Sequence, residues 1–239
     1  MEKDQSYLLR KNQWQKSFLI KASTFFLLIT GFTTSYAQKL QVVTTTTMIS
    51  DAVEQVGGNR VHVNGLMGPG VDPHLYKPAA SDVIKLSRAD IVFYNGLALE
   101  GKMADLFTRL SLQGKPIYAV TRNISKSKLL KPEGVNGHWD PHVWGDPGLW
   151  IECVALIAEG LIKSDPDGQT TYDKGKNDYT EKLKSLKVWG VKNVNKIPSN
   201  NRYLITSHDA FNYFGKAFGF QVVGVQGIST VAEAPLADI

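Results

Sequence analysis

Residues 40–67 have the sequence LQVVTTTTMISDAVEQVGGNRVHVNGLM, in which two β-rich runs flank a helical pattern. The runs 40–45 and 62–67 are rich in β-branched and apolar residues, whereas apolar residues recur at helical intervals over 49–56. Two strands joined by a crossover helix pair in parallel. This stretch therefore predicts the beginning of a parallel α/β sheet.

The same alternation continues to residue 120. Further strands are predicted at 91–95 and 116–120, and further helices at 81–87, with Ser81 as the N-cap, and at 102–110. Four strands with helices between them predict a doubly wound lobe, which we place at residues 38–146.

A different pattern follows residue 146. Asp146-Pro147 opens a helix that runs through Leu161, and Asp165-Pro166 ends it before a long polar helix over 170–196. One face of that long helix is expected to be buried, because apolar residues recur along it at roughly helical intervals: Tyr172, Tyr179, Leu183, Leu186, Trp189 and Val191. We assign residues 147–200 to connecting helices.

A second lobe is predicted to begin at residue 201, with strands at 203–206 and 221–225, a helix at 210–218 between them, and another helix introduced by Pro235. Two strands and one helix do not bury a core of their own. We therefore expect residues 201–239 to be an incomplete lobe.

Residues 1–37 have the features of a cleaved secretory signal peptide. A basic start precedes an apolar run over 22–32 and a small-residue end at Ala37. The apolar run is shorter than the roughly 20 residues that cross a bilayer as a helix. The leader has no cysteine that would accept a lipid anchor, so we expect a free periplasmic protein.

Charge and cysteine content exclude other classes of protein. Removing residues 1–37 takes away five basic and two acidic residues, so the net charge falls from +5 to +2. Lysines over 174–196 alternate with acidic residues, as on a solvated helix face. We therefore expect no nucleic-acid partner. Cys153 lies in the apolar run 151–157 and is expected to be a core residue.

Three histidines occur in matched polar settings. The tripeptide Asp-Pro-His occurs at 72–74 and again at 140–142, and His208 lies in Ser-His-Asp at 207–209. Proline after aspartate disfavours helix and favours a turn, so His74 and His142 are expected on tight loops. The three histidines are separated by 68 and 66 residues, which is too far for a zinc site on one helix or in a zinc finger. A metal site made of His74, His142 and His208 would have to be assembled by tertiary structure.

Several motifs, in matching order, resemble the substrate-binding proteins of zinc and manganese ABC transporters. They are GLMGPGVDPHLY at 65–76, YNGL at 94–97, DPHVW at 140–144, SHDAF at 207–211 and GIST at 227–230. The resemblance covers residues 40–239 and is strongest to the treponemal type, which binds both zinc and manganese.

The resemblance implies two α/β lobes joined by one long, rigid backbone helix, with the metal held between the lobes. It implies His74, His142 and His208 as ligands and an aspartate from late in the second lobe, past Ile239, as the fourth. Asp238 does not correspond to that aspartate, because it falls on an earlier helix of the family pattern. The implied function is capture of Zn²⁺ or Mn²⁺ in the periplasm by a monomer and delivery to an ABC permease.

Ligand chemistry favours zinc without excluding manganese. Imidazoles bind zinc more tightly than manganese in the Irving–Williams order. In the manganese-selective branch of the family, glutamate more often replaces the third histidine. The zinc-specialised branch often has a histidine-rich loop before the second ligand, where this chain offers only His138.

Other roles stay open for these residues. A zinc hydrolase would use three histidines and an open position, but no glutamate lies beside any of them as a general base. An adhesin or structural module of the same fold is a further alternative. His62 and His138 are expected at the surface. Asp72, Asp140 and Asp209 either orient the neighbouring imidazoles or only form turns, and Trp139, Trp144 and Trp150 either shield the site or pack the lobe.

Overall fold

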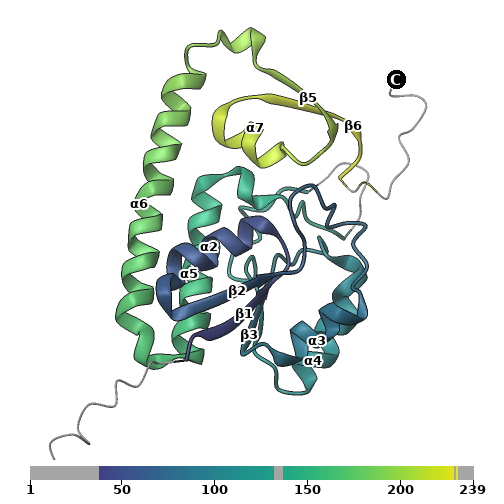
Figure 1. Ribbon diagram of the computed structural model, residues 1–239. Helices are drawn as coiled ribbons and strands as arrows, with labels where there is room; N and C mark the ends of the chain where they lie inside the picture. Colours follow the sequence, from purple (N-terminus) through teal and green to yellow (C-terminus); the bar gives the residue numbers. More distant parts are fainter. Residues whose placement is uncertain (1–37, 132–136, 229, 231–239) are drawn as a thin grey trace, which may run out of the picture. The chain divides into compact units, whose positions relative to one another are not determined.

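The computed structural model describes residues 38–131, 137–228 and 230 (Figure 1). Its strands are β1 (Leu40–Thr44), β2 (Val61–Gly65), β3 (Ile91–Tyr94), β4 (Ile117–Ala119), β5 (Tyr203–His208) and β6 (Gln221–Gln226). Its α-helices are α2 (Thr47–Gly57), α3 (Ala80–Arg88), α4 (Ala104–Leu112), α5 (Pro147–Ser164), α6 (Gln169–Val194) and α7 (Asn212–Phe218). The predicted signal peptide and the predicted helix after Pro235 lie outside the described residues.

The strands form two parallel sheets. The first has the order β2-β1-β3-β4, and the second pairs β5 with β6. In the first sheet the chain passes from β1 to β2 on one side and then returns to β3 on the other. Ligands of open α/β sheets bind beyond the carboxyl ends of the strands, where the strand order reverses in this way. This confirms the predicted parallel α/β architecture.

Helices cover both faces of the first sheet. Neighbouring strand residues point to opposite faces, and Val42 accordingly packs in a core with α2 and α5, while Val43 packs in a second core with α3 and α4. Cys153 is fully buried in the first of these cores, as predicted. The result is the expected doubly wound lobe.

Helix α6 spans 26 residues and packs along α5 and α2 (Figure 1). Its beginning is fixed by Asp165 at the α5–α6 junction. Arg60 donates two hydrogen bonds of 2.8 Å to the Asp165 carboxylate, and the Tyr172 hydroxyl donates a third of 2.5 Å. These bonds hold the pKa of Asp165 below its usual range, with the Arg60 bond as the main cause.

Two local predictions were wrong. Ser81 does not cap α3: the helix begins at Ala80, and the Asp82 carboxylate accepts from the Ala79 N–H at 2.8 Å. The apolar face of α6 is buried only in part. Tyr172 and Leu183 are buried and Gly190 lies against Phe218 of α7, whereas Leu186, Trp189 and Val191 are 49%, 63% and 39% exposed.

Within the described residues, no helix combines the length and the apolar composition needed to cross a membrane.

Candidate metal centre

Two of the three histidines lie in connecting segments of the first lobe, and the third ends a strand of the second sheet. His74 lies in the segment between β2 and α3, His142 lies between β4 and α5, and His208 is the last residue of β5. His208 had been expected beyond its strand, but β5 runs two residues further than predicted. The three histidines therefore come from segments that follow strands of the first sheet and from the carboxyl end of a strand of the second.

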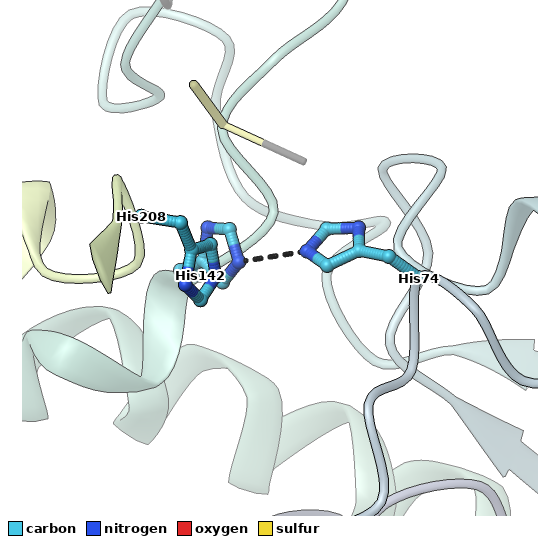
Figure 2. Close-up of side chains that lie close together, drawn as sticks. All are labelled: His74, His142 and His208. Carbon is cyan, nitrogen blue, oxygen red and sulfur yellow. Dashed lines mark hydrogen bonds between the residues drawn. The ribbon is translucent and has the colours of Figure 1, made fainter. Parts of the chain in front are cut away.

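The structure brings all three rings together (Figure 2). One ring nitrogen from each of His74, His142 and His208 lies within 4.8 Å of the other two. The Nε2 atoms of His74 and His142 are 3.1 Å apart, and the ring centroids of the three pairs lie 5.2 to 5.9 Å apart. Figure 2 shows His74 facing the other two rings. His62 and His138 are exposed and take no part, as expected.

Both Asp-Pro-His tripeptides form the same turn. The Oδ1 atom of Asp72 accepts from the His74 N–H at 2.8 Å, and Oδ1 of Asp140 accepts from the His142 N–H at 2.9 Å. A side-chain oxygen that binds the backbone two residues on is the defining contact of an Asx turn. The repeated tripeptide thus has a structural cause.

The three aspartates differ in what they do to the rings. Asp140 Oδ1 also contacts His142 Nδ1 at 2.8 Å, which fixes that ring with Nε2 toward His74. Asp72 binds only the backbone of its histidine. Asp209 accepts instead from the Gly224 N–H, and in the described part of the chain it has no bond to the His208 ring. The orienting role suggested for these aspartates therefore applies, in this structure, to Asp140.

Burial keeps the imidazoles of His74 and His208 in the form that binds metal. Desolvation, together with the neighbouring His142, lowers the pKa of His74 to about 4. Desolvation also lowers the pKa of His208. Neutral imidazole nitrogens are good ligands for zinc and other first-row transition metals. Three histidines supply three of the four ligands of a tetrahedral zinc shell.

The tryptophans have separate roles. The Trp144 ring meets the His142 ring edge-on at 5.2 Å between centroids, so it borders the cluster. Trp150 is buried in the core with Cys153, and Trp139 packs against the same core beneath Lys131. Only Trp144 among the three contacts a histidine of the cluster.

Glu100 is a buried polar residue behind the site that sequence reasoning missed. Glu100 is 4% exposed and accepts from the Thr45 hydroxyl at 2.6 Å and from the Asn95 N–H at 2.7 Å. Burial raises the pKa of Glu100 despite these bonds. The Asn95 amide in turn donates to the Pro141 carbonyl at 3.0 Å, next to His142. The available hint was a charged residue three positions after the motif at 94–97.

Comparison with known proteins finds relatives whose names state the metal that they bind. The manganese-binding lipoprotein MntA of Bacillus subtilis is 46% identical over 202 residues, which are 84% of this chain and 65% of MntA. The zinc-binding protein TroA of Treponema pallidum is 40% identical over 219 residues, 89% of this chain and 70% of TroA. The chain thus spans about two thirds of the length of these relatives.

Solved structures agree in fold. The periplasmic zinc-binding protein TroA from Treponema pallidum superposes with a TM-score of 0.80 at 42% identity, over 84% of this chain and 71% of that one. The Fe(III)-bound YtgA from Chlamydia trachomatis has a TM-score of 0.75 at 27% identity, over 84% and 73% of the two chains. The model of the family of ZnuA, the periplasmic component A of the zinc-uptake complex, matches residues 42–239, and this chain therefore belongs to that family.

Proposed function

We propose that this protein captures a divalent transition-metal ion, zinc or manganese, and delivers it to the membrane permease of an ABC transporter. The observation that carries the proposal is the meeting of His74, His142 and His208, with one nitrogen from each within 4.8 Å. The three are separated by 68 and 66 residues in the sequence. Residues so far apart in the sequence rarely bring three imidazole rings to one point unless they share a ligand.

The proposed ligands are His74, His142 and His208, and the proposed cargo is zinc before manganese. Relatives named for each metal are 46%, 40% and 35% identical to this chain over the matched residues. Three imidazoles bind zinc more tightly than manganese, and manganese needs a larger coordination number or greater availability to compete. The fourth ligand proposed from the family resemblance is a carboxylate.

The proposed organisation follows the family. Residues 38–146 form the first lobe, residues 147–200 connect the lobes through α6, and the second lobe begins at residue 201. We further propose that the protein acts in the periplasm after removal of residues 1–37, as a monomer and as a carrier and not an enzyme. Relatives carry the words "periplasmic" and "lipoprotein" in their names.

Native mass spectrometry of the purified chain tests the proposal. Titration with zinc and with manganese is expected to give one ion per chain, with zinc displacing manganese. His208→Ala is expected to weaken zinc binding by more than about 100-fold, since even residues behind the ligands are worth 10–100-fold. His138→Ala, which removes an exposed histidine, serves as the matched control and should bind like the unaltered chain.

Two outcomes would overturn the proposal. One is a chain that binds no metal at micromolar concentrations. The other is equal binding by His208→Ala and His138→Ala, which would place the metal elsewhere. Hydrolysis of an ester by the zinc-loaded chain, lost in His142→Ala, would favour a hydrolase instead.

A further inference from the structure

The two Asp-Pro-His turns share a feature that their role in holding histidines does not require. In each turn, the aspartate uses Oδ1 for its own histidine and Oδ2 for a residue from beyond α6. Oδ2 of Asp140 accepts from the Asn212 amide at 3.3 Å, and Oδ2 of Asp72 accepts from the Thr230 hydroxyl at 2.6 Å. Asn212 is the first residue of α7, and Thr230 follows β6.

Two contacts join Asp140 to α7: the bond from Asn212 is partly buried, and the bond from Tyr213 is fully buried. Asp140 is fully buried, and its backbone carbonyl accepts from the Tyr213 hydroxyl at 2.9 Å. Tyr213 is fully buried as well, and its hydroxyl also accepts from the Leu130 N–H at 3.0 Å. Breaking such a network leaves buried polar groups without partners, which costs more than the bonds contribute when made.

The contact at Asp72 differs in its exposure to water. Asp72 and Thr230 are each partly exposed, and one side-chain bond joins them. Water replaces a partly exposed hydrogen bond at lower cost than a buried one. The two turns are thus tied to residues beyond α6 by contacts of unequal burial: Asp140 has a buried bond from Tyr213 beside the bond from Asn212, whereas Asp72 has one partly exposed bond from Thr230.

We propose that Asp72 and Thr230 form a releasable latch that controls metal release, while Asp140, Asn212 and Tyr213 form the fixed side of the same cleft. When the hydrogen bond from Thr230 to Asp72 breaks, the loop that carries His74 separates from His208. The hydrogen bonds to Asp140 stay intact. Thr230 is a positioning residue in this scheme, because it acts through Asp72 and the His74 turn and does not touch the metal. The inference rests on the proposed function, since it assigns the release step of the same site.

The test compares release rates of zinc-loaded full-length chains mixed with excess chelator. Thr230→Val removes the hydroxyl donor at nearly constant volume and is expected to speed release by about tenfold, the effect of ~1.4 kcal/mol. Thr230→Ser keeps the donor and should release zinc within about twofold of the unaltered chain. Thr108→Val is the matched control, because its hydroxyl bonds only within α4, to the Ala104 carbonyl.

A second measurement does not depend on metal. Amide hydrogen exchange of the metal-free chain should be faster in peptides covering residues 71–76 of Thr230→Val, since the His74 N–H is bonded to Asp72. Peptides covering residues 138–144 should be unchanged. Asn212→Leu is expected to show the opposite pattern, with faster exchange at 138–144 and a lower melting temperature.

The outcomes separate the latch from the site itself. Release and exchange in Thr230→Val that match the unaltered chain would overturn the latch while leaving metal capture intact. Equal acceleration by Thr230→Val and Thr230→Ser would also overturn it, since the hydroxyl would then be irrelevant. If the unaltered chain takes up no zinc, the proposed function fails, and hydrogen exchange alone decides whether the Thr230 bond orders the His74 turn.

Discussion

Asp140 holds Nδ1 of His142 at 2.8 Å and leaves Nε2 of that ring, 3.1 Å from His74 Nε2, at the point where the rings meet. A carboxylate in this position selects the tautomer of a metal-binding histidine and makes its other nitrogen a stronger ligand. The geometry explains why an aspartate two residues before the histidine serves both the turn and the ring.

Replacing Asp140 with Asn should therefore weaken zinc binding while leaving the histidines in place. Loss of such a partner costs about 10–100-fold in metal affinity. Competition with a chromophoric chelator measures the change, and Asp105→Asn, on the exposed face of α4, is the control. Affinity in Asp140→Asn equal to that of the control would mean that the ring needs no orienting carboxylate.

Acidic pH should weaken both metal binding and the metal-free fold, in a window set by His74. An imidazole in the unfolded chain has a pKa of about 6.5, and burial lowers the pKa of His74 to about 4 in the folded chain. Between these values the unfolded state binds more protons, so stability is full above about pH 6.5 and falls as the pH drops toward 4.

The zinc affinity of the folded chain should depend on the pKa of His74 in the folded state, which is about 4. Because protons compete with metal for each nitrogen, zinc affinity is expected to change little between about pH 7.5 and 6 and to fall steeply below about pH 5. Chelator competition at several pH values measures this, and thermal melts of the metal-free chain follow the stability. A constant zinc affinity down to about pH 4.5 would contradict binding by these imidazoles.

The meeting of the three histidines was predictable because their local motifs repeat, whereas the hydrogen-bond partners of the neighbouring aspartates were not. Asn212, Tyr213 and Thr230 lie 72 to 158 residues from the aspartates that they contact. No local pattern indicates a pairing over such distances, because it arises only when both sheets are in place. Glu100 was missed for a related reason, since its partner Thr45 is brought to it by the parallel pairing of β1 with β3.

The helices show which sequence patterns predict well where a helix begins. Asp146-Pro147 marks the beginning of α5, and the Asp146 carboxylate accepts from the Gly148 N–H as an N-cap does. Prediction failed at α3, where Ser81 had the right residue type for a cap but Asp82 supplied the bond. Periodicity likewise predicted α6 as a helix, but it does not tell which part of an apolar face is covered.

Helix α6 approaches α2 most closely at Gly175. A Cβ there would lie 2.4 Å from the Val56 carbonyl oxygen and 2.7 Å from that of Gln55. Gly175→Ala should therefore lower stability, because overpacking against backbone costs roughly 1–3 kcal/mol and exceeds the gain of up to ~1 kcal/mol in helix propensity. Thermal unfolding measures the effect.

Ser185→Ala, an exposed position on the same helix, is the control for Gly175→Ala and should melt within a degree or two of the unaltered chain. A rise in the melting temperature of Gly175→Ala would show that α6 shifts freely over α2. That result would contradict a rigid connection of the two lobes through α6.

The connection through α6 limits how far the two sheets can separate. The helix is continuous over 26 residues and packs along α5 and α2, with Arg60 and Tyr172 fixing its beginning at Asp165. A continuous helix has no loop residues to absorb a hinge motion. We therefore predict a small adjustment on metal loading and not a wide closure.

Spin labels at Arg88→Cys and Lys216→Cys, both exposed, test this prediction by pulsed electron resonance with and without zinc. Cys153 stays unlabelled, because it is fully buried and burial raises the pKa of its thiol. The distance between the labels should change by no more than about 3 Å, roughly the step of two helical residues. A change of many ångströms would contradict a rigid connection.

X-ray absorption of the zinc-loaded chain determines which atoms surround the metal. Three histidine nitrogens at about 2.0–2.1 Å are expected, the distance usual for zinc–imidazole bonds. The count should fall to two in His74→Ala and stay at three in His62→Ala, which alters an exposed histidine. A shell of oxygen ligands alone, or one that His74→Ala leaves unchanged, would contradict a metal site built from His74, His142 and His208.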